Sequence, residues 1–212
     1  MKCPHCNQQT AQLEFCDKCG KVLPVPADQD FYTVLGYPAR ILQIDEADLE
    51  KRLFELNRKF HPDRFAGKSA QEIQFSHDRS SAVNNAYRTL KNPVSRAKYI
   101  VESTLGSIEE KSAKVPIDMA ERFFEIQDLL ETIRESNGNP PADAVREVRE
   151  AEKELKEKVK SLEADLQKQF TAYDAKPDRK IVEQMKEILS ERSYIKSFLR
   201  QLDGVMNPDD VI

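Results

Sequence analysis

The stretch "RKFHPDRFAGK", residues 58–68, stands where an amphipathic helical pattern stops. Pro62 fixes its own backbone angle φ, lacks an N–H group and disfavours helical conformation at the residue before it. The sequence therefore predicts a helix that starts after Asp45 and ends at His61-Pro62-Asp63. The apolar residues of this helix are spaced four, three and four positions apart, which indicates one buried face: Leu49, Leu53, Leu56 and Phe60.

This helix and turn are basic in a chain that is acidic overall. Residues 51–68 contain six Lys and Arg against two Asp and Glu, whereas the formal net charge of the 212-residue chain is −4. A local cationic patch steers an acidic partner and sets its orientation. A turn that only ends a helix needs no histidine, as "KPD" at 176–178 illustrates. We interpret the turn as the tip of a binding surface, although a plain helix-ending turn remains the simpler alternative.

Short helices surround this turn. Asp30 is placed to cap "FYTVLG" (31–36), and a longer helix is expected over 71–91, ending before Asn92-Pro93. A further short helix is expected over "VSRAKYIVES", residues 94–103. The two helices joined by the His-Pro-Asp loop should pack as an antiparallel hairpin with the loop exposed.

All four cysteines lie in the first 20 residues, as two CxxC pairs: Cys3, Cys6, Cys16 and Cys19. In a reducing compartment such pairs indicate a metal site rather than disulfides. Four thiolates suit one tetrahedral Zn²⁺, and iron accepts the same ligands. We expect a zinc knot over 1–23, with Gly20 permitting a tight turn and His5 as a spacer or a rival ligand. The linker "LPVPAD" (23–28) follows.

The last zone predicts three long helices separated by "SNGNPP" (136–141) and "KPD". The first, 118–135, has a regular apolar stripe that leaves Phe124 outside it, and the second covers about 142–175. The third has a stripe of Ile181, Met185, Ile188, Ile195, Leu199 and Leu202, which leaves Tyr194 and Phe198 unassigned. An aromatic residue among Glu121, Glu125 and Asp128 is typical of a binding surface. A wider buried face explains it equally well.

Composition limits the function classes. The chain is rich in charge and poor in glycine, with no alternating strand pattern, so we expect an all-α protein. No apolar run approaches the length of a membrane span, and the acidic balance argues against general nucleic-acid binding. We see no secretory signal or Arg-rich transit peptide, which favours the bacterial cytoplasm, with a processed mitochondrial-matrix protein as the alternative.

Several motifs together resemble a known family. "DFYTVLG" (30–36), the basic helix, "FHPDRF" (60–65), "NNAYRTL" (84–90) and "NPVSRAKY" (92–99) look like a J-domain in order and spacing. From Asp30 to its end the chain is similar to the HscB-type (Jac-type) co-chaperones of iron–sulfur cluster assembly. The resemblance implies a J-domain over 29–105 and a helical client-binding domain over 117–205. Some members of that family, mitochondrial ones especially, carry a double-CxxC leader.

The resemblance also implies partners and roles. The J-domain of such proteins binds a DnaK/HscA-class chaperone and stimulates its ATPase, so this chain would not itself be an enzyme. By position, the chaperone-binding residues are His61, Pro62, Asp63, Lys51, Arg52, Arg58, Lys59 and Arg64. The residues that bind an IscU-like scaffold are Ala120, Glu121, Phe124, Glu125, Asp128 and Tyr194. At Ala120 and Glu121 the better-known bacterial form has bulkier apolar residues.

Three rival interpretations stay open. A general J-protein would use the same loop for other clients. A zinc-ribbon nucleic-acid module would need basic and aromatic residues near the metal, where residues 1–23 offer only Lys2, Lys18 and Lys21. A dithiol oxidoreductase would need an exposed thiol of low pKa.

Overall fold

In a computed structural model of the chain, the predicted helix that precedes the His-Pro-Asp turn is α2, Glu46–Phe60. The described residues are 1–107, 120–136 and 138–206. The Asp45 carboxylate caps α2 by accepting the Ala47 N–H at 2.9 Å, and Leu49 and Phe60 are its buried residues. The boundaries that the apolar spacing and the proline predict are therefore observed.

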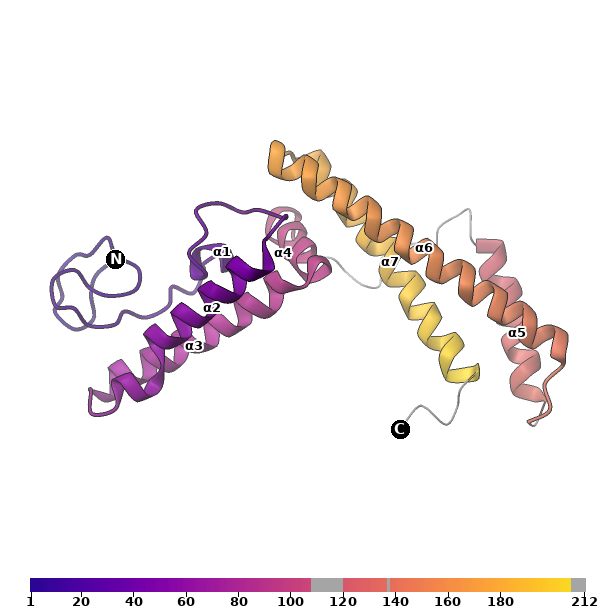
Figure 1. The fold of residues 1–212 in the computed structure, drawn as a ribbon, viewed down its shortest axis with the longest axis horizontal. Coiled ribbons are helices and arrows are strands. Elements are labelled where there is room, and N and C mark those ends of the chain that lie inside the picture. The colour runs from indigo at the N-terminus through magenta and orange to yellow at the C-terminus, as the bar shows by residue number, and fades with distance from the viewer. Residues whose placement is uncertain (108–119, 137, 207–212) are drawn as a thin grey trace. The chain divides into compact units, whose positions relative to one another are not determined.

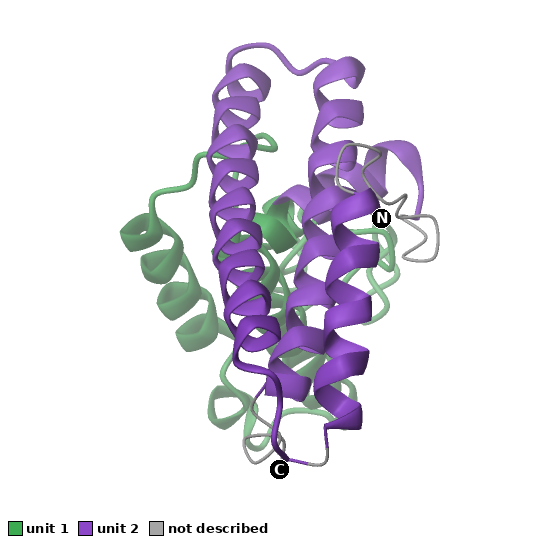
Figure 2. Ribbon diagram, turned by 90° about the vertical axis from the view of Figure 1, so that its right-hand side faces the viewer, with its two compact units in different colours: residues 1–96 green, residues 97–212 purple. Residues whose placement is uncertain are grey.

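The helices divide between two units, residues 1–96 and 97–212, which are coloured separately in Figure 2. The first unit contains the cysteine segment and the short helix α1, Phe31–Val34, which Asp30 caps. It also contains α2, a 3-10 turn η1 at Pro62–Phe65, and α3, Ala70–Lys91. Helix α4, Pro93–Leu105, spans the boundary. The predicted domain limits of the sequence analysis remain predictions.

Helices α2 and α3 form the expected antiparallel hairpin, joined by η1 (Figure 1). Helix α3 begins with a capping box, in which Ser69 and Glu72 satisfy each other's backbone N–H groups. Its buried side includes Val83, Ala86 and Leu90, and α1 packs against it. The hairpin thus holds the His-Pro-Asp turn at its end, between two rigid helices.

The second unit contains a bundle of α5, Ala120–Glu135, α6, Ala142–Ala175, and α7, Arg179–Met206. Figure 1 shows α6 and α7 running side by side. One core joins α5 to α6 as far as Leu162 and to the last part of α7. The apolar spacing of this helix predicts a stripe of Met119, Phe123, Ile126, Leu130 and Ile133, and the last four are buried. Met119 and the predicted domain start at residue 117 lie outside the described residues.

The buried face of α7 differs from the predicted stripe. Met185, Ile195 and Leu202 are buried as expected, but Ile181, Ile188 and Leu199 are only half-buried. The core instead takes Val182, Leu189 and Phe198, and Phe198 packs edge-on against Phe123 with ring centroids 4.7 Å apart. The face rotates by about one residue position because α5 and α6 both approach α7, and their direction is not encoded in α7 alone.

The predicted all-α class is confirmed: the described residues form helices and, in the cysteine segment, isolated β-bridges. Among those residues, no helix combines the length and apolar character needed to cross a membrane.

Candidate functional site

The His-Pro-Asp turn has a defined local geometry. His61 leaves the helix with φ −59° and ψ 130°, and Pro62 starts η1. The Nδ1 atom of His61 accepts the Asp63 backbone N–H at 3.3 Å, and the carbonyl of His61 accepts the Arg64 N–H at 3.0 Å. Phe65 is buried and anchors the far side of the turn. The turn is therefore ordered by its own hydrogen bonds before any partner binds.

The carbonyl of Phe60 ties this turn to α3. The break at Pro62 leaves that carbonyl without a normal helical donor, and a buried carbonyl without a partner is costly. The Ser76 hydroxyl donates to it at 2.7 Å and the Ser80 hydroxyl at 3.0 Å. Ser76 is fully buried, one helical turn from Ser80 on the same face of α3. These two hydroxyls fix where the turn begins.

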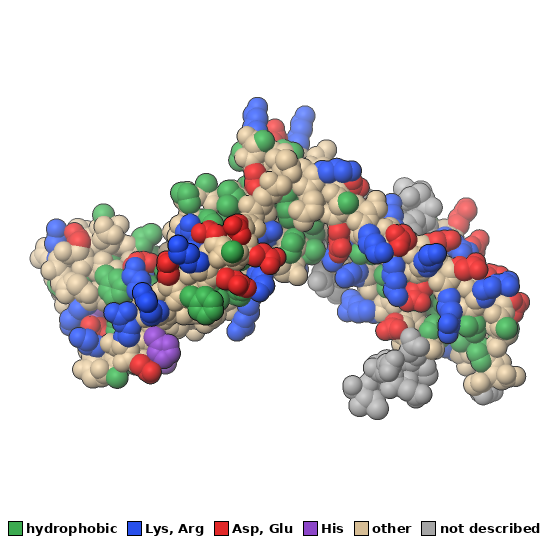
Figure 3. Space-filling model, viewed as in Figure 1, with side chains coloured by type: hydrophobic (Ala, Val, Ile, Leu, Met, Phe, Trp, Pro, Cys, Tyr) green, Lys and Arg blue, Asp and Glu red, His purple; other side chains and the backbone are tan. Residues whose placement is uncertain are grey.

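The side chains of the turn face solvent. His61, Asp63 and Arg64 are exposed, and Pro62 is half-buried. The side chain of Asp63 is 90% exposed, and its Oδ2 lies 3.5 Å from Nδ1 of His61. On the face drawn in Figure 3, Lys and Arg side chains gather near a histidine in the first unit. All four of these sequence-predicted residues are thus accessible to a partner.

Of the four basic residues predicted on α2, Lys51 and Arg58 are exposed. Arg52 is engaged within the domain: its Nε donates to Asp48 at 2.7 Å and its Nη1 to the Gly36 carbonyl at 2.8 Å. Its guanidinium lies 4.2 Å from the ring centroid of Tyr37. The hydrogen bond to Arg52 lowers the pKa of Asp48, and the same bond raises the pKa of Arg52. Arg52 holds the loop after α1 against α2.

Lys59 is also engaged, with the cysteine segment. Its ammonium pairs with the Glu14 carboxylate and lies 5.5 Å from the ring centroid of Phe15 and 5.7 Å from that of Phe60. The Phe15 and Phe60 rings stack with centroids 5.5 Å apart. The exposed part of the predicted basic surface is therefore Lys51, Arg58 and Arg64, beside the turn.

The four cysteines come together as predicted, with all four Sγ atoms within 4.8 Å of one another. The Sγ atoms of Cys3 and Cys19 are 3.7 Å apart, and those of Cys6 and Cys16 are 3.8 Å apart. A tetrahedron of sulfurs placed ~2.3 Å from a central Zn²⁺ has edges of about 3.8 Å. The cysteine set therefore fits one metal ion, and the cysteines are free of disulfides.

The two CxxC pairs form matching turns. The N–H of Asn7 bonds the Cys3 carbonyl at 2.9 Å, and the N–H of Gly20 bonds the Cys16 carbonyl at 2.8 Å. Both following residues have positive φ, 59° at Asn7 and 69° at Gly20. Sequence reasoning identified Gly20 and missed Asn7, although Asn is the side chain that best tolerates this conformation after Gly.

The thiols have unequal proton affinities. Burial raises the pKa of Cys3, but backbone hydrogen bonds at Cys6 and His5 outweigh it and bring the value to about 7. The pKa of Cys19 is raised to about 12. A backbone hydrogen bond at Lys21 lowers it, but burial and the neighbouring sulfurs together raise it by more. Thiols packed this closely disfavour more than one negative charge, and a bound cation would relieve that repulsion.

His5 is neither a bare spacer nor placed as a metal ligand. Its Nε2 lies 3.0 Å from the Val22 carbonyl, and its ring packs edge-on against Phe75 of α3 with centroids 5.7 Å apart. The histidine thus helps to attach the cysteine segment to the hairpin.

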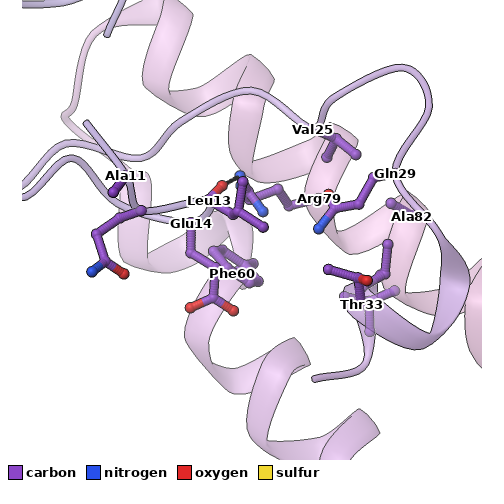
Figure 4. A pocket seen from close by; sticks show the side chains of 12 residues that line it. Ala11, Leu13, Glu14, Val25, Gln29, Thr33, Phe60, Arg79 and Ala82 are labelled. Carbon is purple, nitrogen blue, oxygen red and sulfur yellow. Dashed lines mark hydrogen bonds between the residues drawn. The ribbon is translucent and has the colours of Figure 1, made fainter. Parts of the chain in front are cut away.

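Arg79 of α3 is the functional residue that sequence reasoning missed. It is 5% exposed, and its guanidinium donates to the carbonyl of Leu13 (Figure 4). It also donates to the carbonyls of Leu23 at 2.6 Å and Pro24 at 3.0 Å. Burial lowers the pKa of Arg79 to about 10. Its place on the buried side of α3, between Ser76 and Val83, was the available signal, because a core arginine requires acceptors from elsewhere in the chain.

A cavity of about 320 Å³ lies where these parts meet. Figure 4 shows Leu13, Glu14, Gln29, Thr33 and Phe60 around it. Its walls come from the cysteine segment, the linker, α1, α2 and α3, so the knot and the hairpin form one packed body within the first unit.

The predicted client-binding residues divide into two groups. Glu121, Phe124, Glu125 and Asp128 form one exposed line along α5, and Phe124 is 69% exposed. Glu125 pairs with Arg122 at 3.0 Å. Ala120 is half-buried, and Tyr194 is half-buried with its ring edge-on to Phe123, centroids 5.0 Å apart. An exposed aromatic with an acidic surround is therefore present on α5.

Comparison with known proteins agrees with these features. Residues 30–99 match the family model of the DnaJ domain. The chain is 49% identical over 72 residues to the co-chaperone protein HscB of Proteus mirabilis (strain HI4320), a match that covers 34% of this chain and 41% of that protein. It is 29% identical over 144 residues to the iron-sulfur cluster co-chaperone protein HscB homolog of Arabidopsis thaliana, with 68% and 55% covered. The matches thus span about half the length of these two relatives.

The human HscB protein matches a longer part of this chain. The iron-sulfur cluster co-chaperone protein HscB of Homo sapiens is 28% identical over 184 residues, 86% of this chain and 71% of that protein. The crystal structure of human co-chaperone protein HscB superimposes with a TM-score of 0.66 at 23% identity, covering 98% of this chain and 100% of that chain. At that identity the structural match establishes the fold.

The helical hairpin, its exposed His-Pro-Asp turn and the family match define a protein with a DnaJ domain. Within that class the chain is similar to the HscB co-chaperones, so the resemblance predicted from its motifs is confirmed.

Removing both serine hydroxyls should loosen the turn. We expect Ser76→Ala with Ser80→Ala to destabilise the hairpin by about 1–3 kcal/mol, because the Phe60 carbonyl is then buried without a donor. Amide hydrogen exchange should accelerate most at Arg64 and Ala66, whose N–H groups bond within the turn. Ser81→Ala, an exposed serine on the same helix, is the matched control. Equal exchange in the double variant and this control would contradict the role assigned to the two hydroxyls.

Proposed function

We propose that the protein is a co-chaperone that stimulates ATP hydrolysis by a DnaK/HscA-class chaperone and delivers an IscU-like iron–sulfur scaffold to it, aiding cluster transfer. The observation that carries the proposal is the exposed, internally ordered His-Pro-Asp turn at the end of a DnaJ-domain hairpin. The HscB relatives, two of which are named for iron-sulfur clusters, support the choice of client.

In this proposal the turn acts on the partner, and the ATP chemistry belongs to the partner. His61, Pro62 and Asp63 are the trigger, presented in one conformation so that little entropy is lost on docking. Lys51, Arg58 and Arg64 supply the cationic field that steers an acidic surface onto the turn. The cations of Arg52 and Lys59 already pair with Asp48 and Glu14. In the proposal these two residues therefore maintain the structure of the docking surface rather than attract the partner.

The client surface is the exposed line on α5. Phe124 would enter an apolar depression on the scaffold, and Glu121, Glu125 and Asp128 would favour a basic surround. Ala120 and Tyr194 lie at the half-buried margin of this surface, where they are placed to support it rather than to dominate the affinity. The 69% exposed phenyl ring of Phe124 favours a client-binding surface on α5 over a general J-protein that binds other clients.

We also propose that the cysteine cluster holds zinc in a structural role. Four thiolates on two matching turns leave no open coordination position for catalysis. The cluster anchors the loop whose carbonyls receive the buried Arg79 cation. No nucleic-acid or membrane partner is proposed, and the expected site of action is the bacterial cytoplasm or, in a processed eukaryotic chain, the mitochondrial matrix.

Replacing the trigger histidine should abolish stimulation. In single-turnover ATP hydrolysis by the host's DnaK/HscA-class chaperone, the wild-type protein should accelerate hydrolysis and His61→Gln should not. His77→Gln is the matched control, since His77 is an exposed residue of α3 and not part of the turn. Two outcomes would refute the proposed function: His61→Gln accelerates hydrolysis as the wild type does, or the wild-type protein accelerates it with no host chaperone.

Phe124 should decide client binding. Phe124→Ser should weaken binding of an IscU-like scaffold by about tenfold or more, because a phenyl ring contributes ~1.5–3 kcal/mol when it is buried. Phe124→Leu should retain most of the affinity. Calorimetric titration measures both variants, and melting should be unaffected because the ring is exposed. Scaffold binding unchanged in Phe124→Ser would leave the general J-protein as the better description.

Loss of the metal should destabilise the first unit. We expect one zinc per chain by metal analysis, and Cys16→Ser should lose it and lower stability by about 1–3 kcal/mol as Arg79 loses its carbonyl partners. Lys18→Gln, an exposed change in the same segment, should keep the zinc. Iron in place of zinc, with visible absorption, would overturn the assignment of the metal, and a metal-free chain of equal stability would overturn its structural role.

A further inference from the structure

Helix α2 carries an exposed phenylalanine that the proposed function does not yet use. The side chain of Phe54 is 72% exposed, and among the described residues the other large apolar side chains that are exposed are Met1, Leu13 and Phe124. An exposed phenyl ring contributes no burial free energy to folding, but a partner that covers the ring gains that free energy on binding. Phe54 lies outside the buried stripe of α2, so packing of the hairpin does not require it.

On its own face of α2, the charged neighbours of Phe54 that lack an ion-pair partner among the described residues are cations, since Glu50, four residues before it, pairs with Lys91 at 3.1 Å. Lys51 lies three residues before it and Arg58 four residues after it, a spacing that places all three side chains on one face of a helix. Lys51 and Arg58 are exposed, and neither forms an ion pair with another residue in the described part of the chain. Arg52 and Lys59, one position further on in each case, are both paired. The unpaired cations are the ones that flank the ring.

This line continues into the turn. Three residues after Arg58 comes His61, whose side chain is also exposed. Lys51, Phe54 and Arg58 therefore form a continuous surface with the His-Pro-Asp turn. Glu55, the residue after Phe54, is also exposed. The surface around the ring is therefore only partly cationic.

We propose that Phe54 is the apolar centre of the chaperone-docking surface and enters an apolar pocket on the ATPase domain of a DnaK-class chaperone, with carboxylates around that pocket facing Lys51 and Arg58. The inference rests on the proposed function and adds to it the residue that supplies salt-insensitive affinity. Charges steer the encounter and are screened by salt, whereas burial of a ring at the centre of an interface supplies most of the lasting affinity. The charge of the flanking residues selects an acidic partner.

The test separates docking from triggering. ATP hydrolysis by the host chaperone is measured in single turnovers against the concentration of the added protein, at low and at high salt. Phe54→Gln should raise the concentration for half-maximal stimulation by about tenfold and leave the maximal rate unchanged, because one buried ring contributes about this much binding. His61→Gln should instead remove the maximal rate. Lys51→Gln should weaken docking at low salt and much less at high salt.

Two variants serve as controls. Phe54→Leu keeps an apolar side chain and should restore most of the affinity. Glu55→Gln changes the next residue of the same helical turn and removes a carboxylate that would face an acidic partner, so it should bind equally well or more tightly. Both positions are exposed, and circular dichroism should give unchanged melting for all of these variants.

The outcomes are distinguishable. If His61→Gln abolishes stimulation while Phe54→Gln has the half-maximal concentration of the wild type, the docking role of Phe54 is wrong and the co-chaperone function stands. If the wild-type protein stimulates no chaperone, both fail. If Phe54→Gln changes only the monomer–dimer balance in sedimentation, the ring contacts a second copy of this chain, for which the acidic line on α5 would be the complement, and the chaperone pocket is refuted.

Discussion

The carbonyl of Phe60 is the point on which the hairpin depends. Pro62 ends the helix, and the Arg64 N–H that would otherwise reach the Phe60 carbonyl bonds the His61 carbonyl instead, so the Phe60 carbonyl needs partners outside α2. Ser76 and Ser80 supply them from one face of α3. Because both donors come from the second helix, the end of the first helix, the direction of the turn and the register of the hairpin are set together. Buried hydrogen bonds thereby fix the position of an exposed turn.

The cysteine knot depends on the same helix. Arg79 lies one turn along α3 from Ser76 and directs its cation at carbonyls of residues 13, 23 and 24. A buried cation without acceptors is strongly unfavourable, so the carbonyls of the knot segment stabilise the hairpin. Lys59 and Glu14 make a second connection beside it. We therefore expect a metal ion bound by the four cysteines to stabilise the hairpin that presents the turn.

Sequence periodicity predicted the elements well, because helix caps, prolines and apolar spacing act over a few residues. Asp30, Asp45 and the limits of α6 all follow from such local signals. Asn7 and the Arg52–Asp48 pair were missed although their signals are local. In the other failures the deciding partner is distant in the chain: the Gly36 carbonyl that also holds Arg52 is 16 residues away. Lys59 meets Glu14 across 45 residues, and Phe198 is buried because α5 approaches from a direction that α7 does not encode. The chaperone and scaffold surfaces themselves remain predictions, since exposure alone identifies no partner.

The chain repeats one arrangement with opposite charge. On α2 an exposed phenylalanine lies between Lys51 and Arg58, and on α5 another lies among Glu121, Glu125 and Asp128. Apolar rings carry little information about which partner binds, because any apolar pocket of the right size accepts them. The surrounding charge supplies that information, since like charges across an interface are costly and opposite charges speed the encounter. Two surfaces of opposite sign therefore select different partners, which the proposed co-chaperone function requires.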